Sequence, residues 1–506
     1  MFIAEEGTAA HARVPFVTAV SGQKRQLPPL RGIPGHCTIL DADESTRGLG
    51  RVEDRKLKKS GLSLAVGELT TAAQGDGKAA TLRSEAWGSR SVMEQPVWDV
   101  VVVGAGAAGM LAAYRAALRG LKTVLLEKNR KLGVKILISG GTRCNVTHAT
   151  DARGIVAAFG HQGRFLHSAL AGLGPADVVG LLRSAGVETK SEPNGKIFPA
   201  SDRALDVRDA LAGLVRQTAC VVRTEAPVRD IEFAQGHFRV QLDGDTIHSR
   251  ALILTTGGKS YSGCGTTGDG YAWAEKLGHT IVPPVPALAP LVIGDQWPRE
   301  LTGIALEDVA VTVIRGPKER LEQSRAPFLF THFGLSGPAP MNVSRAFSRW
   351  PTDELKLCCD FAPELHFDQL NQQTTDELQR HRGRAVGSVL WGAFSRRMVE
   401  QILRHAQIDP NQKCAEVSHK KMHQAVGLLK RTELRVQGTR GFQKAEVTAG
   451  GVRLAEVDSS TMQSKRQPGL YFAGEILDLD GPIGGFNFQA AFSTGWLAGN
   501  RVLQNG

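Results

Sequence analysis

Two patterns of apolar and polar positions divide the chain near residue 97. Before this point the apolar runs are short, follow no sustained period and lie among Gly, Ser, Thr, Ala and charged residues. A segment that buries so little apolar surface does not offset the conformational entropy lost on folding, which predicts a disordered extension over residues 1–96. A second interpretation, which the sequence does not separate from the first, is that Met93 is the true start codon.

From residue 97 onward, short apolar runs alternate with amphipathic stretches, which is the pattern of an α/β protein. Residues 100–103 are a β-branched run typical of a buried parallel strand, residues 107–119 predict a helix, and residues 122–126 predict a second strand. Further helices are predicted near 162–171 and 175–186 and over 202–217, and further strands over 220–223 and 252–255.

Beyond residue 283 prolines multiply and the pattern shifts to short strands, such as 309–314 and 326–334, followed by a long helical stretch. The chain ends on a strand, a long loop and a helix. This order predicts an α/β domain that is split in sequence by an inserted barrel-like domain and a small helical subdomain. The predicted boundaries are 97–285 and 456–506 for the α/β domain, 286–362 and 431–455 for the barrel-like domain, and 363–430 for the helical subdomain.

The composition excludes several classes of protein. No apolar run is long enough to cross a bilayer and the N-terminus lacks a signal pattern, so we expect a cytoplasmic protein without membrane contact. The seven cysteines are an odd number and none forms a C-x-x-C pair, so neither a disulfide framework nor a metal site is expected. The net charge of +11 suits a nucleic acid, an anionic substrate or simple solubility. Because no concentrated basic stripe is visible, we expect a small-molecule substrate rather than a nucleic acid, and the sequence does not indicate the oligomeric state.

The first strand and helix enclose a glycine motif that binds dinucleotides in many α/β proteins. Gly104, Gly106 and Gly109 follow G-x-G-x-x-G, which permits a tight turn, close approach of the backbone to a pyrophosphate, and close packing of helix on strand. Glu127 ends the second strand 23 positions after Gly104, where an acid accepts hydrogen bonds from a ribose. Strand, turn, helix and acid together predict a dinucleotide site. The alternative is a glycine-tightened crossover that binds nothing.

Four later segments resemble those of the HI0933/YhiN-like flavoproteins, also called the BaiN family, within the two-dinucleotide-binding-domain superfamily. They are KILISGGTRCNVTH (135–148), TTGGKSYSGCGTTGDGYAWAEKLGH (255–279), FTHFGLSGP (330–338) and TMQSKRQPGLYFAGEILDLDGPIGGFNFQAAFSTG (461–495). The resemblance covers roughly residues 97–506. It implies a Rossmann-like FAD-binding domain, FAD as cofactor, an inserted barrel-like domain and a helical subdomain.

The glycine motif and the resemblance together assign a set of cofactor-binding residues. They are Gly104, Gly106, Ala107, Ala108, Gly109, Glu127, Lys128, Lys135, Gly140, Gly141, Arg143, Cys144, Asn145, Val228, Thr256, Gly257, Gly258, Gly474, Glu475, Gly484, Gly485, Phe486 and Asn487.

The assigned residues have distinct expected roles. Lys135 and Arg143 can balance pyrophosphate charge. By resemblance, Glu475 holds the ribityl chain, while amides over 484–487 face the flavin N1/C2-oxygen edge and favour its reduced form. The alternative for 484–487 is a tight loop that caps a helix, and the alternative for Cys144 is a buried packing thiol.

The literal G-x-G-x-x-G over 263–268 is not expected to be a second nucleotide site. It does not directly follow a strand, and no acid lies at the right distance behind it. A docking site for NAD(P)H is therefore not visible in the sequence. Catalytic residues are equally hard to identify. Tyr261 and His332 are the candidates, and the alternative for His332 is a structural histidine.

The predicted function is that of an FAD-dependent oxidoreductase. We expect NAD(P)H-driven hydride transfer through flavin N5 to a conjugated carbonyl compound or a similar small acceptor. Three alternatives stay open: a flavin-dependent amine oxidase, an RNA-acting flavoprotein that uses basic residues of 363–430, and a non-catalytic FAD-binding protein.

Overall fold

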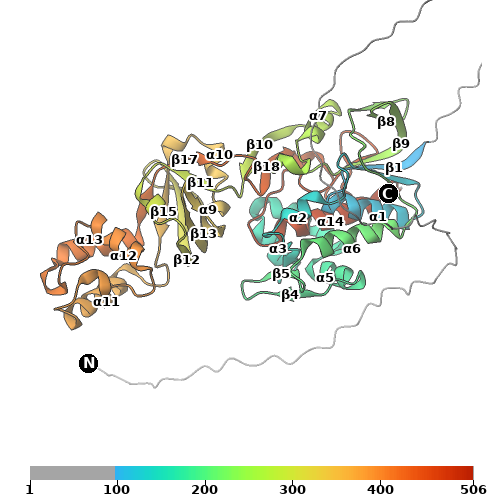
Figure 1. The fold of residues 1–506 in the computed structure, drawn as a ribbon. Helices are drawn as coiled ribbons and strands as arrows, with labels where there is room; N and C mark the ends of the chain where they lie inside the picture. Colours follow the sequence, from blue (N-terminus) through green and yellow to red (C-terminus); the bar gives the residue numbers. More distant parts are fainter. Residues whose placement is uncertain (1–96, 505–506) are drawn as a thin grey trace, which may run out of the picture. The chain divides into compact units, whose positions relative to one another are not determined.

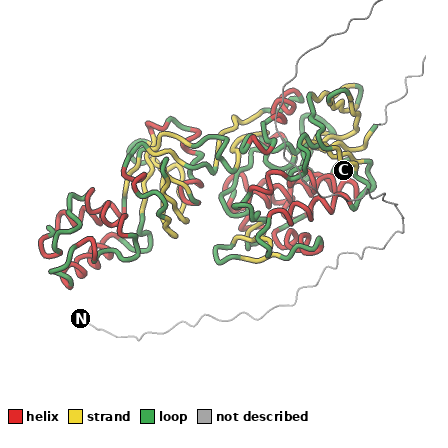
Figure 2. Tube along the Cα trace, viewed as in Figure 1, coloured by secondary structure: helices red, strands yellow, loops and turns green. Residues whose placement is uncertain are grey.

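A computed structural model describes residues 97–504 of the chain (Figures 1 and 2). The extension predicted over residues 1–96, and with it the alternative start at Met93, lies outside the described residues.

The first strand of the main sheet along the chain, β1, is the strand predicted from the β-branched run. Its parallel strands follow the order β6-β2-β1-β9-β19, and β1 pairs in register with both β2 and β9. Every residue of β2 and the last four of β1 are buried, because helices and loops cover both faces of a parallel sheet. The bounds are β1 Trp98–Val103, β2 Thr123–Leu126, β6 Val221–Arg223, β9 Asp245–Leu254 and β19 Leu470–Phe472.

Strand β9 joins two kinds of pairing. Its first half pairs antiparallel with β8 (His237–Leu242), which in turn pairs with β7 (Asp230–Ala234). Its second half, from Leu252 to Leu254, pairs in parallel with β19, which arrives from the end of the chain. The parallel strands therefore come from both parts of the divided α/β domain.

Helices α1 (Ala107–Leu118) and α14 (Phe486–Arg501) pack closely against each other beside this sheet (Figure 1). A Cβ atom at Gly495 would lie 2.2 Å from the Ala108 carbonyl oxygen, so only glycine permits this approach. Helices α4 (His167–Gly172) and α6 (Ala204–Arg216) contact the same pair. The remaining helices here are α2 Val134–Ile138, α3 Ala152–Ala158, α5 Pro175–Ser184 and α7 Asp269–Lys276.

A second seven-stranded sheet is antiparallel throughout and follows the order β16-β15-β12-β13-β14-β11-β17. A single residue, Arg435, separates the two edge strands along the chain, so the sheet curls until its edges adjoin. This is the barrel-like arrangement expected from the sequence. Its elements are β11 Leu291–Ile293, α8 Trp297–Glu300, β12 Ala305–Arg315, β13 Glu319–Thr331, β14 Gly334–Ser336, α9 Pro338–Asn342, α10 Ala346–Arg349, β15 Leu355–Asp360, β16 Thr432–Leu434 and β17 Val436–Thr439.

Helices α11 (Phe367–Arg380), α12 (Arg396–His405) and α13 (His419–Lys430) lie between β15 and β16 and share one apolar core with the curled sheet. Two small sheets complete the fold. Strands β10 (Ile281–Ala287) and β18 (Val447–Val452) form an antiparallel pair, so β18 joins neither large sheet. The three-stranded sheet contains β3 Thr147–His148, β4 Thr189–Ser191 and β5 Lys196–Pro199.

The expected fold class, a Rossmann-like α/β domain with separate strand-rich and helical parts, is confirmed. The domain boundaries stay predictions. Within the described residues no single helix has the length and apolarity to span a membrane, although the bent pair 160–172 and 175–184 meets that test by length and composition alone.

Candidate active site

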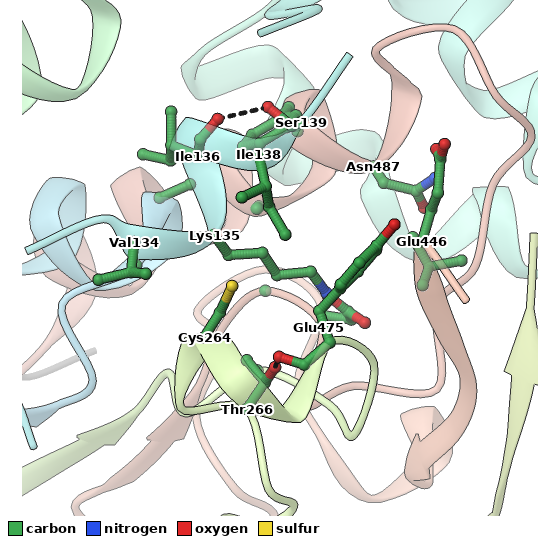
Figure 3. Close-up of a pocket in the computed structure, with 18 of the residues that line it drawn as sticks. Val134, Lys135, Ile136, Ile138, Ser139, Cys264, Thr266, Glu446, Glu475 and Asn487 are labelled. Carbon is green, nitrogen blue, oxygen red and sulfur yellow. Dashed lines mark hydrogen bonds and ion pairs between the residues drawn. The ribbon is translucent and has the colours of Figure 1, made fainter. Parts of the chain in front are cut away.

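One large cavity lies between the carboxyl ends of the parallel strands and the strand-rich part (Figure 3). Its volume is about 790 Å³, within the range of about 300–1,000 Å³ that is usual for ligand pockets. The glycine turn after β1, the end of β2, helix α2 and the loop before α14 line it, as do Leu329 and Met341 from the strand-rich part.

The glycine turn makes one wall suitable for a pyrophosphate. Gly104 has a positive φ of 99°, which lets the chain leave β1 and enter α1 within a few residues. A Cβ atom at Gly106 would meet nothing within 4 Å, so the missing side chain leaves open space at the start of α1. The first turn of α1 carries no acidic residue, and its amides point their partial positive charge toward that space.

Glu127 stands at the end of β2, as a ribose-binding acid should. It is 8% exposed, and its carboxylate accepts hydrogen bonds from the Ala105 amide at 2.8 Å and the Asn129 amide at 2.9 Å. The Asn129 side chain donates a further bond at 2.8 Å. A carboxylate offers about four acceptor positions, so one remains for a ligand in the cavity.

The loop over 263–268, which matches G-x-G-x-x-G literally, lines this same cavity. Asn129 donates to the Cys264 carbonyl at 3.1 Å, and the Lys128 ammonium donates to Thr267 and Asp269, each at 2.6 Å. The loop therefore covers the wall that carries Glu127. Sequence reasoning missed this role, although the glycine-rich composition of the loop was a visible signal.

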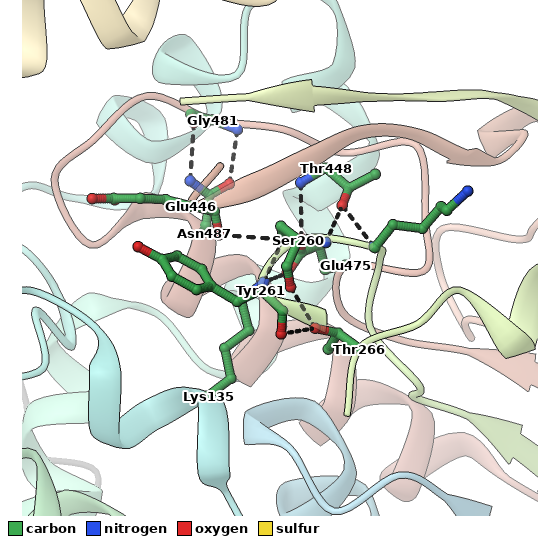
Figure 4. A network of polar contacts seen from close by, with 10 residues as sticks. Lys135, Ser260, Tyr261, Thr266, Glu446, Thr448, Glu475, Gly481 and Asn487 are labelled. Carbon is green, nitrogen blue, oxygen red and sulfur yellow. Dashed lines mark hydrogen bonds and ion pairs between the residues drawn. The ribbon is translucent and has the colours of Figure 1, made fainter. Parts of the chain in front are cut away.

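Lys135 and Glu475, which lie 340 positions apart in sequence, form an ion pair across the cavity at 2.7 Å (Figures 3 and 4). Ser260 bridges the two, and the Thr448 amide donates to Glu475 at 2.9 Å. Both residues line the cavity, as the sequence predicted. However, the charge of Lys135 is matched by Glu475, so it is not a free counter-charge for a pyrophosphate.

Arg143 is likewise engaged with protein carboxylates. Its guanidinium pairs with Glu192 and Asp202 and stacks on the Phe198 ring at 4.0 Å. The hydrogen bonds that Arg143 donates to Glu192 and Asp202 raise its pKa. A role of Lys135 and Arg143 in balancing pyrophosphate charge stays a prediction, since both cations already pair with protein carboxylates.

Side-chain hydrogen bonds hold the loop before α14 in place. With its amide oriented to satisfy its partners, Asn145 accepts from the Gly485 amide at 3.0 Å and donates to the Thr147 carbonyl at 2.9 Å. Asn487 donates to and accepts from the backbone of Gly481, both at 2.9 Å (Figure 4). These bonds fix the N-terminus of α14 at the cavity edge, where the amides of residues 484–487 were expected.

Most of the predicted cofactor residues line the cavity, and five predicted residues do not: Gly109, Cys144, Gly258, Phe486 and His332.

Each of the five has a packing reason. Gly109 touches the Gly104 carbonyl oxygen, and a Cβ atom at Gly258 would lie 2.4 Å from Thr448. Burial raises the pKa of the Cys144 thiol to about 12, as expected of a packing thiol. Phe486 stacks on His148 at 4.6 Å between ring centres. The exposed His332 follows the end of β13 and packs edge-on to its neighbour Phe333, so a catalytic role for it is not supported.

Three further side chains line the cavity, and no hydrogen bond or ion pair from any of these side chains appears within residues 97–504: Lys196, Tyr261 and Glu446. We call them the open wall. Tyr261 has a positive φ of 54°, a strained conformation for a residue with a large side chain. The Tyr261 and Glu446 side chains extend toward the same side (Figure 4). Desolvation and then the nearby charge of Glu446 raise the pKa of Tyr261.

Glu446 was not identified from the sequence. Desolvation by the surrounding protein raises its pKa, and the positive charges of Lys196 and Lys135 oppose that rise. It precedes β18, whose pairing with β10 brings it to the cavity, and a short strand of small residues carries no signal of chemistry.

The fold and this cavity define a protein of the Rossmann dinucleotide-binding class. The family described as HI0933-like protein Rossmann domain matches residues 98–501, and the chain belongs to that family. It is 31% identical over 407 residues to the 3-dehydro-bile acid delta(4,6)-reductase of Clostridium scindens, with 80% of this chain and 98% of that protein covered.

Two further relatives are ribosomal RNA dihydrouridine synthases. The Escherichia coli protein is 32% identical over 412 residues, covering 80% of this chain and 98% of its own length. The Haemophilus influenzae protein is 30% identical over 404 residues, covering 78% and 96%. The expected enzyme class is confirmed, because the family is one of FAD-dependent oxidoreductases. The residues present fit this cofactor at the open space beside Gly106 and at the remaining acceptor position of Glu127.

Proposed function

We propose that this enzyme reduces a carbon–carbon double bond that is conjugated to a carbonyl group. The observation that carries the proposal is the contrast within the cavity. One wall suits a dinucleotide, and the open wall presents a phenol, an ammonium and a carboxylate that no hydrogen bond or ion pair engages within residues 97–504. The names of the relatives support it, because a 3-oxo-4,6-diene and a uracil ring both contain a C=C bond conjugated to C=O.

FAD, held by the amides at the start of α1 and by Glu127, would supply two-electron hydride chemistry for such a system. The chain itself must then stabilise negative charge on the carbonyl oxygen and deliver a proton to the α-carbon. Tyr261 suits the first task as a hydrogen-bond donor and, by giving up that proton in a later step, the second, because a phenol carries its proton at neutral pH and desolvation raises its pKa further. The ammonium of Lys196 provides a second donor that can attract the carbonyl oxygen.

The electron donor is proposed to be NADH or NADPH, docking transiently. The test is an anaerobic titration of the purified protein with each donor while the visible flavin band is followed. Bleaching by either donor, and recovery of the band on adding 2-cyclohexenone, are expected. A yellow protein that neither donor bleaches would contradict NAD(P)H as donor and favour an oxidase or a non-catalytic flavoprotein.

A second candidate substrate is a uracil base within RNA, which a specific feature of the helical subdomain favours. The backbone of Cys414 and Ala415 donates to the Arg384 and Arg382 carbonyls at 2.9 and 3.0 Å, which brings Lys413 beside two arginines. All three cations are exposed, and none pairs with a carboxylate within residues 97–504. Such a cluster suits phosphates. Salt-dependent binding of ribosomal RNA, lost in an R382E/R384E variant, would support this candidate, and salt-independent or absent binding would exclude it.

A further inference from the structure

The ionisable side chains around the cavity fall into two groups. Those near the glycine turn and α2 are already engaged by protein, as in the pairs of Lys128 with Asp269 and Lys135 with Glu475. Glu127 accepts from backbone and side-chain donors in the same way. Glu446 differs, because no donor within residues 97–504 reaches its carboxylate although it lines the same cavity.

An unengaged carboxylate inside a cavity favours particular ligands. When ionised it only accepts hydrogen bonds, and covering it with an apolar group or another acceptor leaves it without a partner at a free-energy cost. A site built around such a group rejects analogues that lack the matching donor more strongly than an apolar pocket rejects a change of shape.

Lys196 lies close enough for its charge to influence Glu446, yet no ion pair joins them. The charge of Glu446 in turn raises the pKa of Tyr261, and no hydrogen bond to the Tyr261 phenol is formed within residues 97–504. The open wall therefore offers two donors and one acceptor around the same space. A simple conjugated ketone satisfies the two donors and leaves Glu446 unmatched.

We infer that Glu446 is a specificity-determining residue, which accepts a hydrogen bond from an N–H or O–H group that the substrate carries beside its conjugated carbonyl. This inference rests on the proposed function and narrows its substrate class. Lactams, imides and enolic diones carry such a donor, whereas simple enones do not. Tyr261 and Lys196 then contact the carbonyl oxygen of the same ring.

The test compares two saturated rings, glutarimide and N-methylglutarimide, in which a methyl group replaces the hydrogen of the N–H donor. Their dissociation constants are measured by ligand-observed NMR on the FAD-loaded full chain, without turnover. We expect glutarimide to bind about tenfold more tightly, as a charge-assisted hydrogen bond implies. The E446A variant should reduce this ratio to about one. In E446Q, which conserves size, the ratio should fall to about threefold or less.

Two controls separate this role from others. E433Q removes a carboxylate that pairs with Lys356 on the strand-rich sheet outside the cavity, and it should leave the ratio unchanged. Y261F should weaken both probes equally.

A ratio near one in the unmodified protein, an unchanged ratio in E446Q or E446A, or no binding of either probe would each overturn the inference. Because no turnover is involved, the result is independent of whether NAD(P)H or enones react. Enone reduction without probe discrimination would therefore refute the role of Glu446 alone.

Discussion

The ionisable groups that line the cavity are used in two opposite ways. On the wall around the glycine turn, Lys128, Lys135 and Arg143 are all matched by protein carboxylates. On the open wall, Tyr261 and Glu446 are matched by nothing within the described residues. Groups that are paired in advance hold a shape for a ligand that stays bound, whereas unpaired groups are available to a ligand that comes and goes. This comparison supports our proposal that the cofactor binds at the first wall and the substrate at the second.

The largest expected effect comes from filling the open space at the paired wall. A G106V substitution adds a side chain where no atom lies within 4 Å, at an ordinary φ of −77°, so the fold should persist. We expect loss of nearly all bound FAD, measured as the ratio of flavin to protein absorbance, with a near-unchanged circular dichroism spectrum. Full FAD retention would contradict the assignment of this wall.

Removing the Tyr261 hydroxyl should lower the rate of the reaction without changing the amount of bound FAD. Y261F should lower kcat by about 10²–10⁴-fold, the usual range for a lost general acid, while FAD content stays the same. Y114F is the matched control, since Tyr114 packs against Trp496 away from the cavity. Equal activity of Y261F and the unmodified enzyme would remove Tyr261 from the mechanism.

Substitutions of Lys135 and Glu475 test whether the two charges of this ion pair stabilise the protein together. The side chains are 24% and 19% exposed, so a single K135M or E475Q change strands a largely buried charge. Each should lower the free energy of unfolding of the apoprotein by about 1–3 kcal/mol, with the double variant less affected than the sum, in urea titrations. Additive effects would argue that the pair makes no coupled contribution.

The smallest expected effects concern the stability contributions of two carboxylates, the hydrogen-bonded Glu456 and the unpaired Glu446. Burial alone would raise the pKa of Glu456, but hydrogen bonds from Thr280 and then Arg466 outweigh it and lower the pKa to about 2. Its stabilising contribution is therefore present above about pH 4.5 and is lost as pH falls toward 2, so E456Q should destabilise the protein at neutral pH.

Glu446 should behave in the opposite way. Desolvation raises its pKa against the charges of Lys196 and Lys135, and because the residue is exposed at the cavity, its ionisation at neutral pH opposes folding only slightly. E446Q should raise Tm slightly at pH 7 and have no such effect below pH 4.5. A lower Tm for E446Q at pH 7 would show that Glu446 is a paired structural group, contrary to the comparison of the walls.

Local signals in the sequence were sufficient for the glycine turn and Glu127, but not for the ion pair on the same wall or for Glu446. Gly104, Gly106 and Glu127 belong to one strand–helix–strand unit, so their spacing along the chain already determines their proximity. A buried parallel strand could also be predicted from a β-branched run such as residues 100–103. By contrast, the partner of Lys135 lies 340 positions away, and no local pattern encodes that ion pair.

Glu446 and His332 show two ways in which local sequence patterns fail to identify cavity residues. Glu446 reaches the cavity only because β18 pairs with β10, more than 150 residues earlier in the chain. His332 lies in a segment that resembles the family, yet the end of β13 leaves it exposed and outside the cavity wall. Segment resemblance identified the region, and tertiary pairing decided which side chains line the cavity.

The most direct test of the account is a single-turnover experiment on FAD-loaded protein reduced anaerobically with dithionite. It is mixed with a conjugated carbonyl acceptor, 2-cyclohexenone or uridine, and the return of the oxidised flavin band is followed. We expect reoxidation by at least one conjugated acceptor, none by the saturated analogues cyclohexanone and dihydrouridine, and strong slowing in Y261F. Reduced flavin that no conjugated acceptor reoxidises, or that reacts equally with the saturated analogues, would contradict the reduction of a conjugated double bond at the open wall.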